Sequence, residues 1–216
     1  GPLHFVQFWL DIVAEWEQEN GEVLVDLAVN KDVQDAILAD PVRSKIVDII
    51  DIEQWFYHNK GEYAPPGGVN MAQRQYMRKI RTGSARFEDV YRAVSEYHQK
   101  FPDKAVVYSA QKAPELCWAS LMAGGSCAAI PVTDNAFLEE LSQMAPRPLD
   151  SQGVYLLEGP NGYLVFNDTA DFTLDLKPGK YMLYQIDAKS GAISFLRDVT
   201  ESVPLSNHRI WWLKRK

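Results

Sequence analysis

Apolar residues recur in the first half of the chain with two alternating periods. Phe5, Trp9 and Ile12 stand three or four positions apart, which predicts an amphipathic helix near the start of the chain. The β-branched run over residues 22–29 predicts a strand after it. The same periods then predict helices over residues 32–45, 87–100 and 114–123 and strands over residues 46–52 and 104–109. Strands that alternate with helices indicate parallel β/α units, in a barrel or in a doubly wound sheet.

Beyond Pro148 the helical period gives way to short apolar runs. Turn sequences such as Pro160-Asn161-Gly162 separate these runs, and turns of this kind join antiparallel strands. Strands are predicted over residues 154–157, 162–166, 172–176, 181–186 and 192–195. The predicted fold class is therefore α/β followed by all-β, with a small antiparallel β-sandwich over residues 149–216 after a domain over residues 1–148.

A long polar connection over residues 58–85 interrupts the first domain. It contains Pro65-Pro66-Gly67-Gly68, which breaks helices and strands. Connections of this length in compact domains are usually functional or disordered. Tyr63 and Arg74 in this segment are therefore predicted to contact a ligand.

The composition excludes several classes of function. With 22 basic and 29 acidic residues the net charge is −7, which disfavours nucleic acid as a partner because phosphate backbones need clustered Lys and Arg. No apolar run reaches the roughly 18 residues of a membrane span. Cys117 and Cys127 are predicted to be buried thiols, with a bridge between them as the alternative. No metal site or cofactor is predicted, because the paired Cys or His spacing of such sites is missing.

Three segments of the first domain are similar to one known family. They are Lys31–Pro41, Phe87–Val94 and Leu121–Ser126, and they resemble a family of uncharacterised glycoside-hydrolase-like bacterial proteins over most of residues 5–130. The resemblance implies a TIM barrel, and this chain would hold a partial parallel (β/α) barrel made of its last three strands. The tail is similar to the small β-sandwich that often follows such barrels and is named as a collagen-binding domain.

The resemblance also implies a hydrolase activity on carbohydrate. In retaining hydrolases of this barrel class the acid/base lies on the fourth strand, which would fall outside this chain. Relatives are expected to carry Arg-Tyr before the Trp of the seventh strand. This chain departs from that pattern, because Glu53-Gln54 precedes Trp55. An open half-barrel exposes strand edges, so the expected protein partner is the missing half of the barrel or a second copy of the chain.

Localisation is expected to be secreted or periplasmic. The chain opens with Gly1-Pro2 and no initiator Met, as a processed end, an engineered scar or an excised fragment would. A signal peptide removed before Gly1 would leave a processed end of this kind.

Alternation within the first two predicted strands places acidic side chains on one face. In a parallel barrel the positions that face the helices are apolar and the alternate set faces the interior. The apolar set includes Leu27, Ile50 and Ile52. The alternate set, which would face inward, contains Asp26, Asp51, Glu53 and Trp55.

Glu53 and Asp51 are the predicted catalytic residues. A glycosidase needs two carboxyl groups roughly 5 to 9.5 Å apart, one of them with a raised pKa. Glu53 is nearest the carboxyl end of its strand, where barrel enzymes build their sites, and it is predicted as nucleophile, base or substrate ligand. The alternative is a structural carboxylate, and it applies most to the deeper Asp51 and Asp26, because buried carboxylates are usually paired.

Polar and aromatic residues around these acids are predicted to bind substrate. Asn30 ends the first strand, and Trp55, Tyr57 and Tyr63 suit a sugar platform because an aromatic face packs on apolar ring surfaces; packing at the barrel mouth is the alternative. His58 is a candidate proton donor or partner of sugar hydroxyls, with an exposed loop histidine as the alternative.

The sequence thus predicts a carbohydrate-active protein, part of a glycoside hydrolase that acts on polysaccharide or oligosaccharide. A non-catalytic carbohydrate-binding or interaction protein on the same scaffold is the alternative, and an inactive fragment is a third reading. The chain would be an enzyme only where the complete barrel is present.

Overall fold

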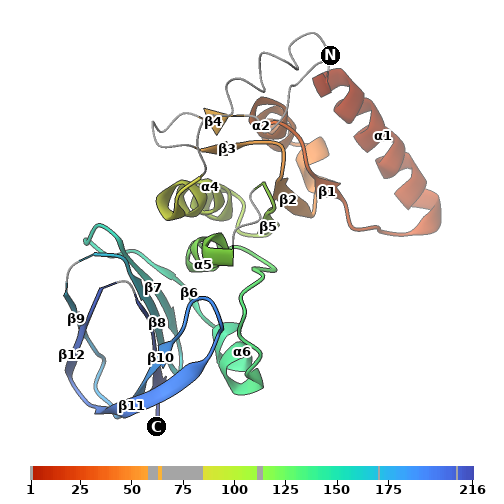
Figure 1. Ribbon diagram of the computed structural model, residues 1–216. Helices are drawn as coiled ribbons and strands as arrows, with labels where there is room; N and C mark the ends of the chain where they lie inside the picture. Colours follow the sequence, from red (N-terminus) through yellow and green to blue (C-terminus); the bar gives the residue numbers. More distant parts are fainter. Residues whose placement is uncertain (1, 58–62, 65–84, 111–113, 170, 208) are drawn as a thin grey trace. The chain divides into compact units, whose positions relative to one another are not determined.

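The computed structural model describes residues 2–57, 63–64, 85–110, 114–169, 171–207 and 209–216 (Figure 1). Two predicted ligand contacts, His58 and Arg74, lie outside the described residues. Contacts between Cα atoms divide the chain into two compact units, Gly1–Ala128 and Ala129–Lys216. Each unit has its own hydrophobic core.

The first unit is a short parallel sheet covered by helices. Its elements are α1 (Pro2–Asn20), β1 (Asp26–Leu27), α2 (Lys31–Ala39), the 3₁₀ turn η1 (Arg43–Lys45), β2 (Ile49–Ile52), the β3 (Phe56–Tyr57) and β4 (Tyr63–Ala64) pair, α4 (Phe87–Lys100), β5 (Ala105–Tyr108) and α5 (Pro114–Met122). The strands β1, β2 and β5 pair in that order, and both pairings are parallel.

Strand alternation gives this sheet one buried and one open face. Leu27, Ile50 and Val106 are directly opposite one another across the three strands, and all three are buried in the core of the unit. On the other face Asp26 is exposed and Asp51 is half-buried. The predicted separation of apolar and acidic positions is therefore found in β1 and β2.

The predicted partial barrel is wrong. The structure has a three-stranded parallel sheet in the first unit and a six-stranded antiparallel sheet in the second. The first predicted strand, residues 22–29, pairs over Asp26 and Leu27 alone, and Leu24 before them is 81% exposed. A β/α alternation specifies parallel pairing, but closure depends on strand tilt and stagger that a local pattern does not encode.

The predicted helix over residues 32–45 ends early for a local reason. α2 stops at Ala39, and Asp40 has ψ 116°, an extended conformation. A proline disfavours helical geometry in the residue before it, and Pro41 follows Asp40 directly. The chain then makes the short turn η1, in which Arg43 pairs with Asp40 and with Asp11 of α1.

The second unit is mainly antiparallel. It contains α6 (Asn135–Leu141), β6 (Ala145–Arg147), β7 (Val154–Gly159), β8 (Gly162–Asn167), β9 (Phe172–Asp175), β10 (Tyr181–Ile186), β11 (Ile193–Val199), β12 (Ser202–Leu205) and β13 (Arg209–Arg215). One sheet has the order β11-β10-β13-β8-β7-β6, and β9 pairs with β12 in a second. The five predicted strands correspond to β7 through β11, whereas β6, β12 and β13 were not predicted.

The two sheets of this unit pack as a small sandwich (Figure 1). Leu174 of β9 and Val203 of β12 share a core with Val165, Leu183 and Leu213 of the larger sheet. The opposite face of the larger sheet is covered by α6, whose Phe137 ring lies 5.1 Å from the Trp212 ring at 83°. The β-sandwich-like part of the predicted fold is thus present.

The predicted domain boundary and the division by contacts lie at different positions. The former falls at residues 148/149 and the latter at residues 128/129. Between them lie α6 and β6, and β6 is the sixth strand of the large sheet through its pairing with β7. The boundary lies at residues 128/129 if the second unit needs α6 and β6 to fold, and at residues 148/149 if it does not.

Candidate functional site

Three acidic side chains gather at the open face of the parallel sheet. Asp26 lies in β1 and Asp51 in β2, and Glu53 follows β2 directly. Asp51 is opposite Val107 in β5, and two residues later Ser109 donates a hydrogen bond from its Oγ to Asp51 Oδ1 at 2.7 Å. These acids thus come from adjacent parallel strands, at the edge where the carboxyl ends of the strands meet.

The pKa values of Asp26 and Asp51 are raised by burial and by neighbouring acidic charges. Burial raises the pKa of Asp51 most; the Ser109 hydrogen bond opposes this, and the charges of Asp26 and Glu53 add to the increase. Burial and then the charge of Glu53 raise the pKa of Asp26. Within the described chain none of the three acids forms an ion pair with Lys or Arg. We call these three residues, which have no basic partner among the described residues, the acidic cluster (Asp26, Asp51 and Glu53).

A carboxyl group with a raised pKa beside a second carboxylate can exchange protons with a ligand. Glu53 is exposed, and its Oε2 accepts a hydrogen bond from Gln54 Nε2 at 2.9 Å. Asp51 is less accessible and is held by Ser109. The arrangement places an exposed and a less accessible carboxyl group on one face of the sheet, and carboxyl groups are common general acids and bases.

Among the described residues, no group of three or more His, Cys, Asp or Glu could hold a metal ion.

The two cysteines are not joined by a disulfide. The prediction that both are buried thiols is wrong. Cys117 of α5 is half-buried, and Cys127, which lies in the loop after α5, is exposed.

Trp55 is placed in the core and not at an open surface. Its ring is fully buried, and its Nε1 donates to Gln34 Oε1 at 2.9 Å. The Gln34 amide nitrogen in turn donates to the carbonyl oxygens of Leu27 and Asp51. The chain bends at Gln54, after β2 has ended, so strand alternation no longer decides which way Trp55 points. A buried ring offers no face to a sugar.

Tyr57 belongs to a partly buried ionic network between α2 and α4. Lys31 Nζ lies 2.9 Å from Asp35 Oδ2 and 2.9 Å from Glu96 Oε1, and it also lies 5.1 Å from the centre of the Trp55 ring. The Tyr57 hydroxyl donates to Glu96 Oε2 at 2.7 Å. We call these four polar residues, Lys31, Asp35, Tyr57 and Glu96, the lysine network.

The pKa values in the lysine network favour the charged pair. Burial opposes ionisation of Glu96, but hydrogen bonds from Lys31, Tyr57 and Lys100 lower its pKa overall. Burial likewise opposes the charge on Lys31, and its hydrogen bonds to Glu96 and Asp35 raise its pKa. Burial and then the Glu96 hydrogen bond raise the pKa of Tyr57 to about 12. The network is therefore a charged, mutually satisfied structure at neutral pH.

The remaining predicted contacts are spread over the first unit. Asn30 is the residue before α2, is half-buried and makes no side-chain cap hydrogen bond. Tyr63 pairs with Tyr57 through the β3–β4 backbone. The structure thus brings Asp51 and Glu53 together and assigns Trp55 and Tyr57 to packing and hydrogen bonding.

Two residues that organise this region were not predicted. Gln34 joins β1, β2 and Trp55, and no sequence signal marks a buried glutamine in a helix. Ser109 lies in no Gly-x-Ser-x-Gly motif, so no hydrolase signature marks it in the sequence. Ser109 lies two residues beyond Val107, and Val107 is opposite Asp51 in the sheet. Only this strand register identifies Ser109 as a partner of Asp51.

No helix in the described ranges is both long and apolar enough to cross a bilayer.

The sequence and structure were compared with known proteins. A family model described as "Domain of unknown function (DUF6298)" matches residues 1–144. No curated protein matches the sequence.

Among solved structures, the chain is similar to a protein titled "Glycoside hydrolase", with 11% identity and a TM-score of 0.52, over 99% of this chain and 69% of that chain. It is also similar to a glycoside hydrolase family 5 protein from Bacteroides vulgatus ATCC 8482, with 12% identity and a TM-score of 0.49, over 83% of this chain and 52% of that one. The chain thus spans about half the length of the Bacteroides protein. At such identities the likeness concerns fold alone.

Proposed function

The chain belongs to the family described as Domain of unknown function (DUF6298). We propose that it is part of a carbohydrate-active protein of the glycoside hydrolase type. The observation that carries the proposal is the acidic cluster on the open face of the parallel sheet. Its carboxyl groups come from neighbouring strands, and burial together with their charges raises the pKa values of Asp26 and Asp51. The similarity of fold to a protein titled as a glycoside hydrolase is consistent with it.

In this proposal Glu53 and Asp51 have different roles. Glu53 is exposed and would meet the sugar as a nucleophile, base or ligand. Asp51 keeps its proton to higher pH than an ordinary aspartate, and a proton donor in glycoside hydrolysis needs such a raised pKa. Asp26 lies nearby and would act through its charge on Asp51.

Hydrolysis by the complete protein tests the proposal. Reducing sugar released from xylan, cellulose, mannan and pectin would be measured for the wild type and for Glu53→Gln, Asp51→Asn and Glu15→Gln. Loss of a catalytic carboxylate should lower kcat by roughly 100-fold or more. Glu15 is an exposed residue of α1, so Glu15→Gln should leave kcat unchanged. Full activity in Glu53→Gln would refute the assignment of Glu53.

A second readout does not depend on activity. Because the charge of Glu53 raises the pKa values of Asp26 and Asp51, Glu53→Gln should lower both. Carboxyl-carbon NMR titration of the two aspartates would measure the change. Unchanged titration of both residues would show that the three acids do not form one site.

Sugar binding without hydrolysis is the second candidate function. The hydrogen bond from Ser109 to Asp51 favours it, because a carboxyl group satisfied by a neighbouring hydroxyl suits a structural role. In that case the same polysaccharides would be bound, and no reducing sugar would be released.

A further inference from the structure

The second unit contains an open groove of about 560 Å³ at one end of its six-stranded sheet. This volume lies within the range of small-molecule sites, roughly 300 to 1,000 Å³. Six of its lining residues carry the argument: Phe166, Gln185, Ile186, Asn207, Arg209 and Ile210. They come from β8, β10, β13 and the segment before β13, and all of them lie within the second unit.

Three apolar lining residues form a row across neighbouring strands. Phe166 of β8 is directly opposite Ile210 of β13, and Ile210 is directly opposite Ile186 of β10. Paired residues of adjacent strands project from the same face of a sheet. Ile186 and Ile210 are buried, and Phe166 is half-buried, with its ring edge-on to Tyr155 at 6.3 Å. These residues alternate with Gln185 of β10 and Arg209 of β13, so the row projects from the opposite face of the sheet and holds the three strand ends together.

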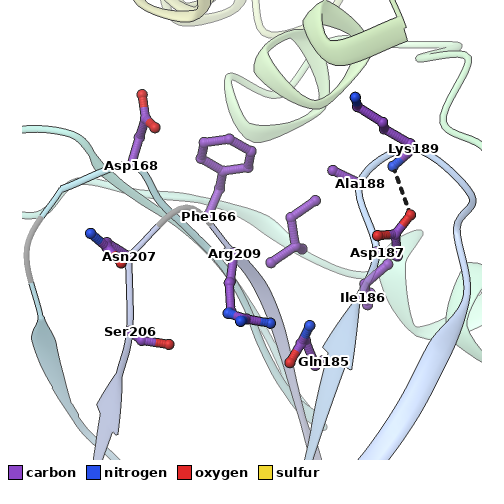
Figure 2. Close-up of a pocket in the computed structure, with 11 residues that line it drawn as sticks. Phe166, Asp168, Gln185, Ile186, Asp187, Ala188, Lys189, Ser206, Asn207 and Arg209 are labelled. Atoms are coloured by element: carbon purple, nitrogen blue, oxygen red, sulfur yellow. Dashed lines mark hydrogen bonds between the residues drawn. The ribbon is translucent and has the colours of Figure 1, made fainter.

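The rim of the groove carries polar side chains with hydrogen-bonding capacity to spare. Among the described residues, Gln185, Asn207 and Arg209 have no side-chain hydrogen bond or ion pair to another residue. By contrast, Arg215 of the same strand as Arg209 donates to the carbonyl oxygen of Pro178. Figure 2 shows Arg209 and Gln185 between the Ser206–Asn207 segment and the turn that begins at Asp187.

One wall of the groove is a turn fixed by its own hydrogen bonds. Asp187 Oδ1 accepts from the backbone N–H and the Oγ of Ser190, both at 2.7 Å, and from the N–H of Lys189 at 3.2 Å. The hydrogen bonds from Ser190 lower the pKa of Asp187, so it stays ionised at neutral pH. The wall is thus formed before any ligand arrives, and a preformed wall reduces the entropy lost on binding.

We propose that this groove binds a neutral sugar residue at the end of an oligosaccharide. Amide and guanidinium groups can pair with adjacent hydroxyls, which both donate and accept hydrogen bonds. The four charged groups of the lining, Asp168, Asp187, Lys189 and Arg209, sum to zero, which favours an uncharged ligand. The inference rests on the proposed function for the class of ligand, and it uses none of the residues of the acidic cluster.

Titration of the ¹⁵N-labelled chain with cellohexaose, xylohexaose and mannohexaose tests the proposal. At least one of these probes should shift the amide signals of Gln185, Asn207 and Arg209. Asn207→Ala and Arg209→Ala should each weaken that binding about tenfold or more, since each removes a hydrogen-bonding group. Arg197→Ala is the matched control, because Arg197 is an exposed arginine of β11 outside the groove, and it should bind as the wild type does.

Three outcomes would overturn the inference. They are no shift with any of the three probes, binding that Asn207→Ala and Arg209→Ala leave unchanged, and binding of oligogalacturonate in place of the neutral probes. Glu53→Gln separates this inference from the proposed function: it should abolish hydrolysis and leave groove binding intact. Arg209→Ala should do the reverse, with hydrolysis of a short soluble substrate retained.

Discussion

Lys31 shows how a single residue joins parts of the chain that are distant in sequence. It is 8% exposed, yet it forms ion pairs with both Asp35 and Glu96. The pairing with Asp35 follows from helical spacing of four residues. The pairing with Glu96 depends on how α2 and α4 pack, and it joins the two helices through a partly buried network.

Lys31→Met should destabilise the first unit by about 2–3 kcal/mol at neutral pH. Removal of one partner from a buried ion pair leaves the other charge uncompensated and typically costs about 3–5 kcal/mol; the partial exposure of Asp35 and Glu96 reduces this. Urea unfolding of the variant and the wild type measures the difference. Lys45→Met is the control, because Lys45 is exposed in η1, and it should change stability little.

The cost of Lys31→Met should depend on pH. The folded-state pKa of Glu96 is lowered, so its stabilising contribution is present above its unfolded-state pKa and is lost as the pH falls through the folded-state value. The folded-state pKa of Lys31 is raised, so its contribution is lost only in strongly alkaline solution. The destabilisation should therefore shrink below about pH 4. An equal cost at pH 7 and pH 3 would show that lost packing, and not charge, accounts for the effect.

At the scale of elements, the turn of the β7–β8 hairpin lies against a third strand, β13. Pro160-Asn161-Gly162 was predicted as a turn from residue types alone. In the structure Gly162 has φ 154°, and a Cβ atom there would lie 1.9 Å from the carbonyl oxygen of Leu213 in β13. The glycine is therefore required by the neighbouring strand as well as by the turn.

Gly162→Ala should destabilise the second unit by more than about 2 kcal/mol, because β8 and β13 would have to separate to admit the methyl group. Thermal unfolding followed by circular dichroism measures the loss. Gly21→Ala offers a comparison: Gly21 ends α1 with φ 92° and has no atom within 4 Å of an added Cβ. It should cost about 1 kcal/mol. Similar losses in both variants would argue against the close approach of Leu213.

At the scale of the whole molecule, the two units should fold separately. Each has its own core, which is the usual condition for an independent domain. A fragment over residues 129–216 should therefore unfold cooperatively, with a dispersed NMR spectrum. A fragment over residues 149–216 should be less stable, because it lacks Phe137, which packs on Trp212, and β6, which pairs with β7.

The pair of fragments also decides between the two boundaries. Equal stability of the fragments would support the boundary predicted at residues 148/149. A clear loss of stability in the shorter one would support the division at residues 128/129.

The sequence by itself determined the order of the elements and the faces of the short strands. Helical and strand periods are local, so they identified α4, β5 and the strands β7 to β10 close to their observed positions. Strand alternation also placed Asp51 and Glu53 on the acidic side, because side chains of an extended chain alternate with no help from the rest of the fold.

Only the tertiary structure decided what depends on long-range pairing. It showed an open three-stranded sheet where a partial barrel was predicted, since closure requires partners that local patterns do not specify. It buried Trp55 beside Gln34, because the bend at Gln54 ends the alternation that had placed Trp55 with the acids. It also assembled the groove around Arg209 from β8, β10 and β13. Those strands lie far apart in sequence, and only their hydrogen-bonded register brings the lining residues together.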